Sequence, residues 1–174
     1  MPYAKKLIAA YIKNSEPDHR IVFLQNGFVP LLGKLHGDET GKWGRMNAQQ
    51  MVEHLSVIFK VSTGGILFEL ITPRDQLPKF KEFLYSDKQF RENTRAPVLP
   101  EEPLDLRFLS MQEAIGELRD EVNAFFEFFK NDLLITTLHP VFGELNFEEW
   151  IQLHHKHVTH HLRQFDLIEN RSTA

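Results

Sequence analysis

Hydrophobic residues recur at helical spacing in several stretches of the chain. The clearest stretch follows Ser110, where Glu113 completes a capping-box pattern. Apolar residues then recur at spacings of four and three, which is typical of the buried face of a packed helix. They are Met111, Ile115, Leu118, Val122, Phe125 and Phe129. The pattern predicts a helix over 110–129, and we assign its phenylalanines to the core and to an interface.

Two more helices are predicted from the same start signal, an Asn followed three residues later by Gln or Glu. The first covers 47–62 and ends before a Gly-Gly pair, and the second runs from 146 to about Ile168. The capping pairs are Asn47 with Gln50 and Asn146 with Glu149. With a less distinct helical stretch over 18–35, in which we expect a kink at Pro30, they make four helices.

The remaining segments carry weaker signals. Residues 5–14 have the pattern of a short helix within an N-terminal extension, 1–16. A connection over 65–109 contains five prolines; we expect one short helix at 73–85 and an extended excursion over 87–107. No convincing alternating strand pattern is present. The sequence therefore predicts a single all-α domain, 1–174, most simply a four-helix bundle.

Composition narrows the class of protein. The 174 residues carry a net charge of −4, whereas a general nucleic-acid binder normally has a basic surplus. No stretch approaches the roughly 18 apolar residues of a membrane span. The first residues lack the layout of a signal peptide, so we expect a cytoplasmic protein that contacts neither nucleic acid nor membrane.

The nine histidines and the absence of cysteine bear most directly on chemistry. Five of the histidines fall between His154 and His161. On the predicted helix, His157 and His161 lie at the centre of the apolar face, and His154 and His160 flank them. The opposite face, expected to point to solvent, carries Gln152, His155, Lys156, Thr159, Arg163 and Asp166. His54 is centred on the apolar stripe of the helix over 47–62, whose Glu53, Ser56 and Lys60 lie on the far side.

Three inward imidazoles on two helices could satisfy one another through a metal ion, because two histidines at i and i+4 project from one helix face. A third His from a facing helix completes a three-histidine site with an open coordination position. Less specific explanations remain open. An HxxxH pair alone is weak evidence, and a single buried His is more often hydrogen-bonded in the core than a ligand. A site without metal also remains open.

These residues resemble the DinB/YfiT-like superfamily. The run "HHKHVTHHLRQF" (154–165) is similar to the last helix of that superfamily, with His157, His161 and Gln164 at the motif positions. The segment "MNAQQMVEHL" (46–55) resembles the helix with the first ligand, His54. The segments "KWGRMNAQQMVEHL" (42–55) and "HPVFGELNFEEW" (139–150) resemble one branch of the superfamily.

The resemblance implies an up-down-down-up four-helix bundle, a homodimer, and nickel, zinc or iron bound by His54, His157 and His161. It also implies a metal-dependent thiol-transferase or hydrolase that activates water or a low-molecular-weight thiol for a small-molecule substrate. Because the chain has no cysteine, any sulfur would come from the cosubstrate. The alternative is a metal-stabilised binding or regulatory protein without turnover.

Other polar residues near the predicted site have no assigned role. His154 and His160 compete for a place among the ligands, and His139 could reach the site from the segment before the last helix. Gln164 would either orient a ligand or form a hydrogen bond at the helix end. Just before the helix over 47–62, Trp43 is expected to pack, and Arg45 is a candidate contact for an anion.

Overall fold

The computed structural model describes residues 18–94 and 102–169 of the chain. The helix predicted at 5–14 and part of the excursion predicted at 87–107 lie outside the described residues. Among the described residues, no helix is long and apolar enough to cross a membrane.

The structure is mostly helical, and its three long helices begin where the capping signals predict. They are α4 (Ala48–Ser62), α6 (Met111–Phe129) and α7 (Phe147–Gln164). Both Asn capping boxes form, so each of these caps satisfies backbone N–H groups at its helix start. Ser110 caps the third helix, but Glu113 accepts from the backbone of Leu109 instead of closing the box.

Helix α7 ends at Gln164, earlier than the predicted Ile168. The chain turns back there, because the backbone N–H of Leu167 donates to the carbonyl of Leu162 at 2.8 Å. Asp166 adopts a left-handed conformation with φ of 57°. These two features are typical of a helix C-terminus that closes on itself.

The N-terminal helical segment is interrupted, but not at the predicted position. It consists of α2 (His19–Val22), a π-helical turn, η1 (Phe23–Gly27), and α3 (Val29–Leu32). Pro30 lies in the first turn of α3, where a missing N–H costs no hydrogen bond. The prediction of a kink at Pro30 is therefore wrong, and the irregularity is the π-helical turn that precedes it.

The long connection contains the predicted short helix, formed by a 3₁₀ turn, η2 (Arg74–Gln76), and by α5 (Leu77–Tyr85). The expectation of no strands is wrong in one place, because β1 (Thr137–His139) and β2 (Gly143–Leu145) pair as an antiparallel hairpin. Thr137 lies opposite Leu145. Strands of three residues are too short to produce a recognisable alternation.

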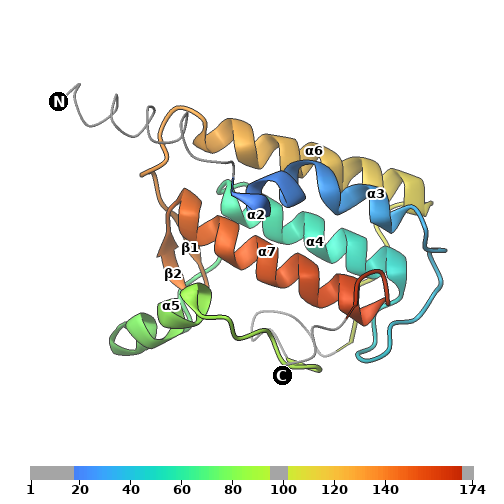
Figure 1. Cartoon of the computed structure of the whole chain (residues 1–174), viewed down its shortest axis with the longest axis horizontal. Helices are drawn as coiled ribbons and strands as arrows, with labels where there is room; N and C mark the ends of the chain where they lie inside the picture. The colour runs from blue at the N-terminus through green and yellow to red at the C-terminus, as the bar shows by residue number, and fades with distance from the viewer. Residues whose placement is uncertain (1–17, 95–101, 170–174) are drawn as a thin grey trace.

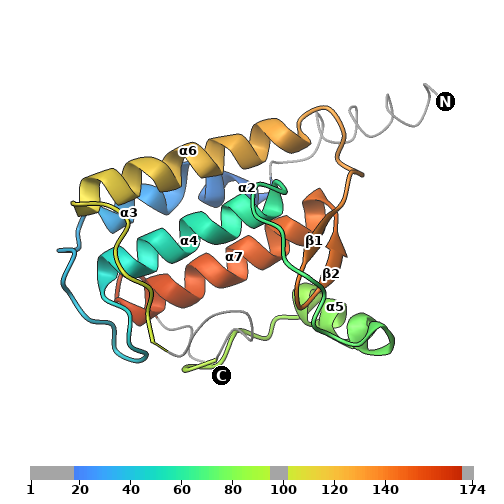
Figure 2. The same cartoon turned by 180° about the vertical axis from the view of Figure 1, so that it is seen from behind.

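Figures 1 and 2 show α4 between α6 and α7, with α2 and α3 beside α6 and α7, and with α5 and the hairpin at one end. The core between these elements is aromatic: Phe59 of α4 stacks on Phe28 and meets Phe125 of α6 edge to face. Because both α4 and α7 have neighbours on several sides, few of their residues reach solvent.

The prediction that the last helix has a solvated face is wrong for most of that face, and the far side of α4 is covered as well. Glu53 and Ser56 of α4 are buried, as are Gln152, Lys156 and Thr159 of α7. Buried polar groups need partners, and Glu53, Ser56, Lys156 and Thr159 have them. The Glu53 carboxylate accepts from the backbone N–H groups of residues 107 and 108, so it holds the segment that leads into α6.

Candidate metal centre

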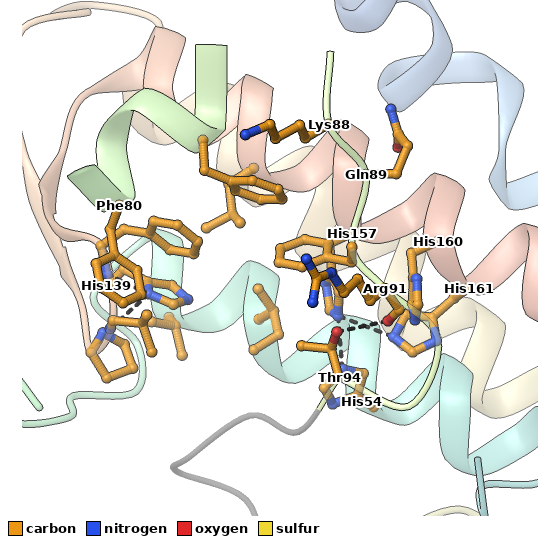
Figure 3. Close-up of a pocket in the computed structure, with 18 of the residues that line it drawn as sticks. His54, Phe80, Lys88, Gln89, Arg91, Thr94, His139, His157, His160 and His161 are labelled. Atoms are coloured by element: carbon orange, nitrogen blue, oxygen red, sulfur yellow. Dashed lines mark hydrogen bonds between the residues drawn. The ribbon is translucent and has the colours of Figure 1, made fainter. Parts of the chain in front are cut away.

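Three histidine side chains converge where α4 and α7 face each other. His157 and His161 lie one turn apart on α7, and His54 meets them from α4. The Nε2 atom of His157 is 2.8 Å from Nε2 of His54 and 3.1 Å from Nε2 of His161. The three side chains offer ligand atoms that all lie within 4.8 Å of one another, a metal-binding distance. These are the three residues predicted from the sequence, and the structure brings them together (Figure 3).

Gln164 orients His161. Its side-chain amide donates to the carbonyl of Trp43 at 2.6 Å, so its Oε1 atom faces Nδ1 of His161 at 2.8 Å. An amide oxygen only accepts, so Nδ1 of His161 carries the hydrogen. In the neutral ring, Nε2 of His161 is then a bare acceptor that points at the other two imidazoles. Of the two roles considered for Gln164, the structure shows a hydrogen bond at the end of α7, and its partner is His161.

Burial keeps these imidazoles neutral. It lowers the pKa of His54 to about 4, with a smaller contribution from His160. It also holds the pKa values of His157 and His161 well below the ordinary value, and the neighbouring imidazoles lower them further. A neutral imidazole is the form that binds metal, because one of its ring nitrogens has a free lone pair. Near neutral pH each of the three rings can therefore offer a nitrogen ligand.

The cluster forms part of the wall of a cavity of about 1070 Å³. Figure 3 shows the three histidines at one end of this cavity and His139 with Phe80 at the other. Among the described residues, the group of ligand-forming side chains has three members, all histidines. An ion held by them would therefore keep a coordination position that opens toward the cavity.

The other histidines of α7 lie apart from the cluster. His154 is fully buried, its ring stacks on Phe59 at 3.8 Å, and its two ring nitrogens have no hydrogen-bond partner among the described residues. His155 is half-buried against Phe23 of η1, so the prediction that it points to solvent is wrong. Neither residue belongs to the three-histidine group.

His160 and His139 line the cavity without joining the three-histidine group. His160 hydrogen-bonds to the backbone of Phe90. At the far end, Nδ1 of His139 accepts from the backbone N–H groups of Val141 and Phe142 at 3.0 and 3.2 Å. Burial lowers the pKa of His139 to about 4, as expected for a ring that must accept these bonds.

Trp43 and Arg45 precede α4. The ring of Trp43 packs against His160, as expected for a packing residue. The Arg45 guanidinium forms an ion pair with Glu102, so the structure does not support its assignment as an anion contact.

The excursion predicted at 87–107 was expected to cross the surface, and its contribution to the cavity was not predicted from the sequence. Residues 86–94, which we call the strap, cross the cavity and place Lys88, Phe90, Arg91 and Thr94 in its wall. Helix α7 holds the strap: the Lys156 ammonium donates to the carbonyls of residues 86 and 88, and Arg163 donates to Gln89. No local pattern predicts this placement, because the contacting residues are about 70 positions apart in the chain.

Fold and site together define a mostly helical protein with three histidines at metal-binding distance. A family model of the DinB superfamily matches residues 28–165. The chain belongs to the DinB superfamily. No curated protein and no solved structure gave a significant match.

Proposed function

We propose that the protein is a metal-dependent enzyme in which His54, His157 and His161 hold a divalent ion. The observation that carries this proposal is that three neutral imidazoles converge in the wall of a large cavity. A structural metal site is usually closed by a fourth protein ligand, whereas a catalytic site keeps a position for water or substrate. A three-histidine group beside a cavity leaves such a position open, as a catalytic site does.

The donor set fits a cation. Nε2 of His161 carries no hydrogen in the neutral ring. Nε2 of His157 carries at most one hydrogen, so it can donate to His161 or to His54 but not fully to both. Hydrogen bonds among the rings therefore satisfy the three atoms poorly. Ligand nitrogens at about 2.0–2.1 Å from a tetrahedral ion lie roughly 3.3 Å apart, close to the separations of 2.8 and 3.1 Å from Nε2 of His157 to Nε2 of His54 and of His161.

The ion would act as a Lewis acid and lower the pKa of a bound water or small thiol toward neutrality. The chain supplies the surroundings. Gln164 sets the tautomer of His161, and such orienting hydrogen bonds raise the basicity of a ligand. His160 lines the cavity beside the cluster and is the nearest candidate to exchange a proton. Any thiol would be external, because the chain has no cysteine.

The same proposal includes the topology of the helices, the oligomeric state, the location, the identity of the metal and the type of reaction. We place the four packed segments in an up-down-down-up four-helix bundle, and we propose a cytoplasmic homodimer that uses nickel, zinc or iron. Histidine sites accept several of these ions, so metal analysis decides among them. The reaction would be thiol transfer to, or hydrolysis of, a small molecule.

Elemental analysis and activity assays of the purified protein test the proposal together. We expect about one divalent ion per chain and its loss in His157→Ala, because a two-histidine remnant binds metal weakly. His155→Ala, on the same helix, is the matched control and should retain the ion. Metal-loaded protein should turn over either an aryl halide with small thiols or an activated ester.

Three results would contradict the proposal. Wild-type protein without stoichiometric metal, or His157→Ala with unchanged metal, would remove the metal site. A stoichiometric ion without turnover of either substrate class would leave the alternative, a metal-stabilised binding or regulatory protein.

A further inference from the structure

The cavity beside the three histidines has an apolar body. Its lining includes the aromatic rings of Phe83, Phe90 and Phe142, together with aliphatic side chains of α4 and α7. Phe83 contacts both of the other rings, which gives one continuous aromatic wall. A cavity of about 1070 Å³ with such a wall accommodates an elongated apolar molecule.

The charges around this apolar body all have one sign. Lys79, Lys88 and Arg91 line the cavity, whereas none of its described lining residues is an Asp or Glu. The side chains of these three cations form no ion pair with any described carboxylate. The charged side chains of the described lining therefore favour an anionic ligand.

The strap meets the histidine cluster at one end of the cavity, where the ring of Phe90 packs against those of His157 and His160. Figure 3 draws Arg91 and Thr94 of the strap at this end of the cavity. The opposite end holds Phe80, Val141 and Phe142 around His139, with Lys79 also among the lining residues. A ligand with one charged head and an apolar tail therefore fits best with its head at Arg91.

We propose that the cavity binds an elongated apolar carboxylate, with its carboxylate at Arg91 beside the three histidines and its tail along the aromatic wall. The ligand class rests on the lining of the cavity, and only the statement that the carboxylate end is the reacting end rests on the proposed function. Arg91 offers a fork of N–H donors that matches the two oxygens of a carboxylate. Lys79 lines the cavity too and precedes Phe80, which lies at the opposite end (Figure 3).

Calorimetric titration of the purified protein with hexanoate, octanoate and decanoate tests this proposal. Because each buried methylene contributes about 0.8 kcal/mol, the affinity should rise about fourfold for each added CH₂. Octanoate should bind about two- to fivefold more tightly than octan-1-ol, because Arg91 is exposed and solvent screens its pair with a carboxylate.

Variants locate the head group. Arg91→Gln should lose most of the preference for octanoate over octan-1-ol and retain the binding of the alcohol. Arg119→Gln, on the exposed face of α6, is the matched control and should bind both as the wild type does. Lys79→Gln should change the octanoate affinity by less than Arg91→Gln does.

The proposal is overturned by equal affinity for octanoate and octan-1-ol, by no dependence on chain length, or by Arg91→Gln behaving like Arg119→Gln. A larger effect of Lys79→Gln would overturn the assigned orientation. If the protein binds no stoichiometric metal but binds the carboxylates with the expected dependence on chain length, the proposed metal chemistry is wrong and the proposed ligand class is supported.

Discussion

At the residue scale, the side chain that decides the geometry of the candidate metal centre is Gln164. It joins Nδ1 of His161 to the carbonyl of Trp43, and so fixes both the ring and its tautomer. The motif position of this glutamine was identified from the sequence, but its role was not. The role depends on Trp43, which lies more than a hundred residues earlier and which no local pattern places beside α7.

Gln164→Ala is expected to weaken metal binding by about 10- to 100-fold, because a histidine ligand without its orienting hydrogen bond loses basicity and order. The measurement is competition with a chromophoric chelator. Gln112→Ala, at an exposed position of α6, is the control and should bind metal as the wild type does. If Gln164→Ala has wild-type affinity, the positioning role is wrong.

His139 links stability to pH. Its folded pKa, lowered to about 4 by burial, lies below the value of about 6.5 expected when unfolded. Between these values the unfolded chain binds more protons, so stability decreases as pH falls from 6.5 to 4. At full extent the contribution is about 3 kcal/mol, because each tenfold difference in proton affinity corresponds to roughly 1.4 kcal/mol.

The variant His139→Asn keeps an acceptor for the two backbone N–H groups and removes the titration. In urea unfolding at pH 7 and pH 4.5, it should lose less stability on acidification than the wild type does. The control His19→Asn, at an exposed site, should follow the wild type. An equal loss in all three proteins would show that His139 does not contribute.

At the element scale, α7 both carries two of the three site histidines and holds the strap that crosses the cavity. The buried Lys156 ammonium donates to the carbonyls of residues 86 and 88 and lies over the ring of Phe83. Burial lowers the pKa of Lys156, and Asp87 partly opposes that change. Lysine at this position was predicted to be solvated, since a charge pattern cannot show which residues another segment covers.

Lys156→Met keeps most of the aliphatic stem and removes both hydrogen bonds to the strap. We expect a loss of about 2 kcal/mol, typical of bonds to a charged donor, and faster amide hydrogen exchange within 86–94. Lys34→Met, at an exposed position, is the control. Unchanged exchange in the strap would contradict its attachment to α7.

The loop before α4 closes on the end of α7. The backbone N–H of Lys42 donates to the carbonyl of Gln164, and Gly44 has φ of 79°. A Cβ atom on Gly44 would lie 2.7 Å from Nε2 of Gln164. Only glycine therefore allows both the turn and the hydrogen bond that orients His161.

Gly44→Ala should lower stability by about 1 kcal/mol or more and should also weaken metal binding, because it displaces Gln164. Gly64→Ala is a matched control, since Gly64 has φ of 74° but nothing within 4 Å of an added Cβ. It should lower stability and leave metal affinity unchanged. Equal metal affinities in the two variants would contradict the link between the loop and the site.

At the scale of the whole molecule, the long helices and the three site histidines were predictable, because capping pairs and apolar periodicity are local. The burial of the polar sides of α4 and α7 could not be predicted from the sequence. Glu53 is buried by bonds to backbone N–H groups of another segment, and such pairing leaves no trace in local periodicity. The cavity escaped prediction for the same reason, as its lining comes from α4, α5, α7, the hairpin and the strap.

We propose that these segments together assemble an open three-histidine metal site. X-ray absorption spectroscopy of the purified protein, with wild type beside His157→Ala, tests it most directly. We predict three imidazole nitrogens at about 2.0–2.1 Å from a single ion, with the remaining coordination filled by exchangeable oxygen, and loss of this signal in the variant. An ion with a fourth protein ligand, an unchanged spectrum in His157→Ala, or no bound ion in the wild type would contradict the account.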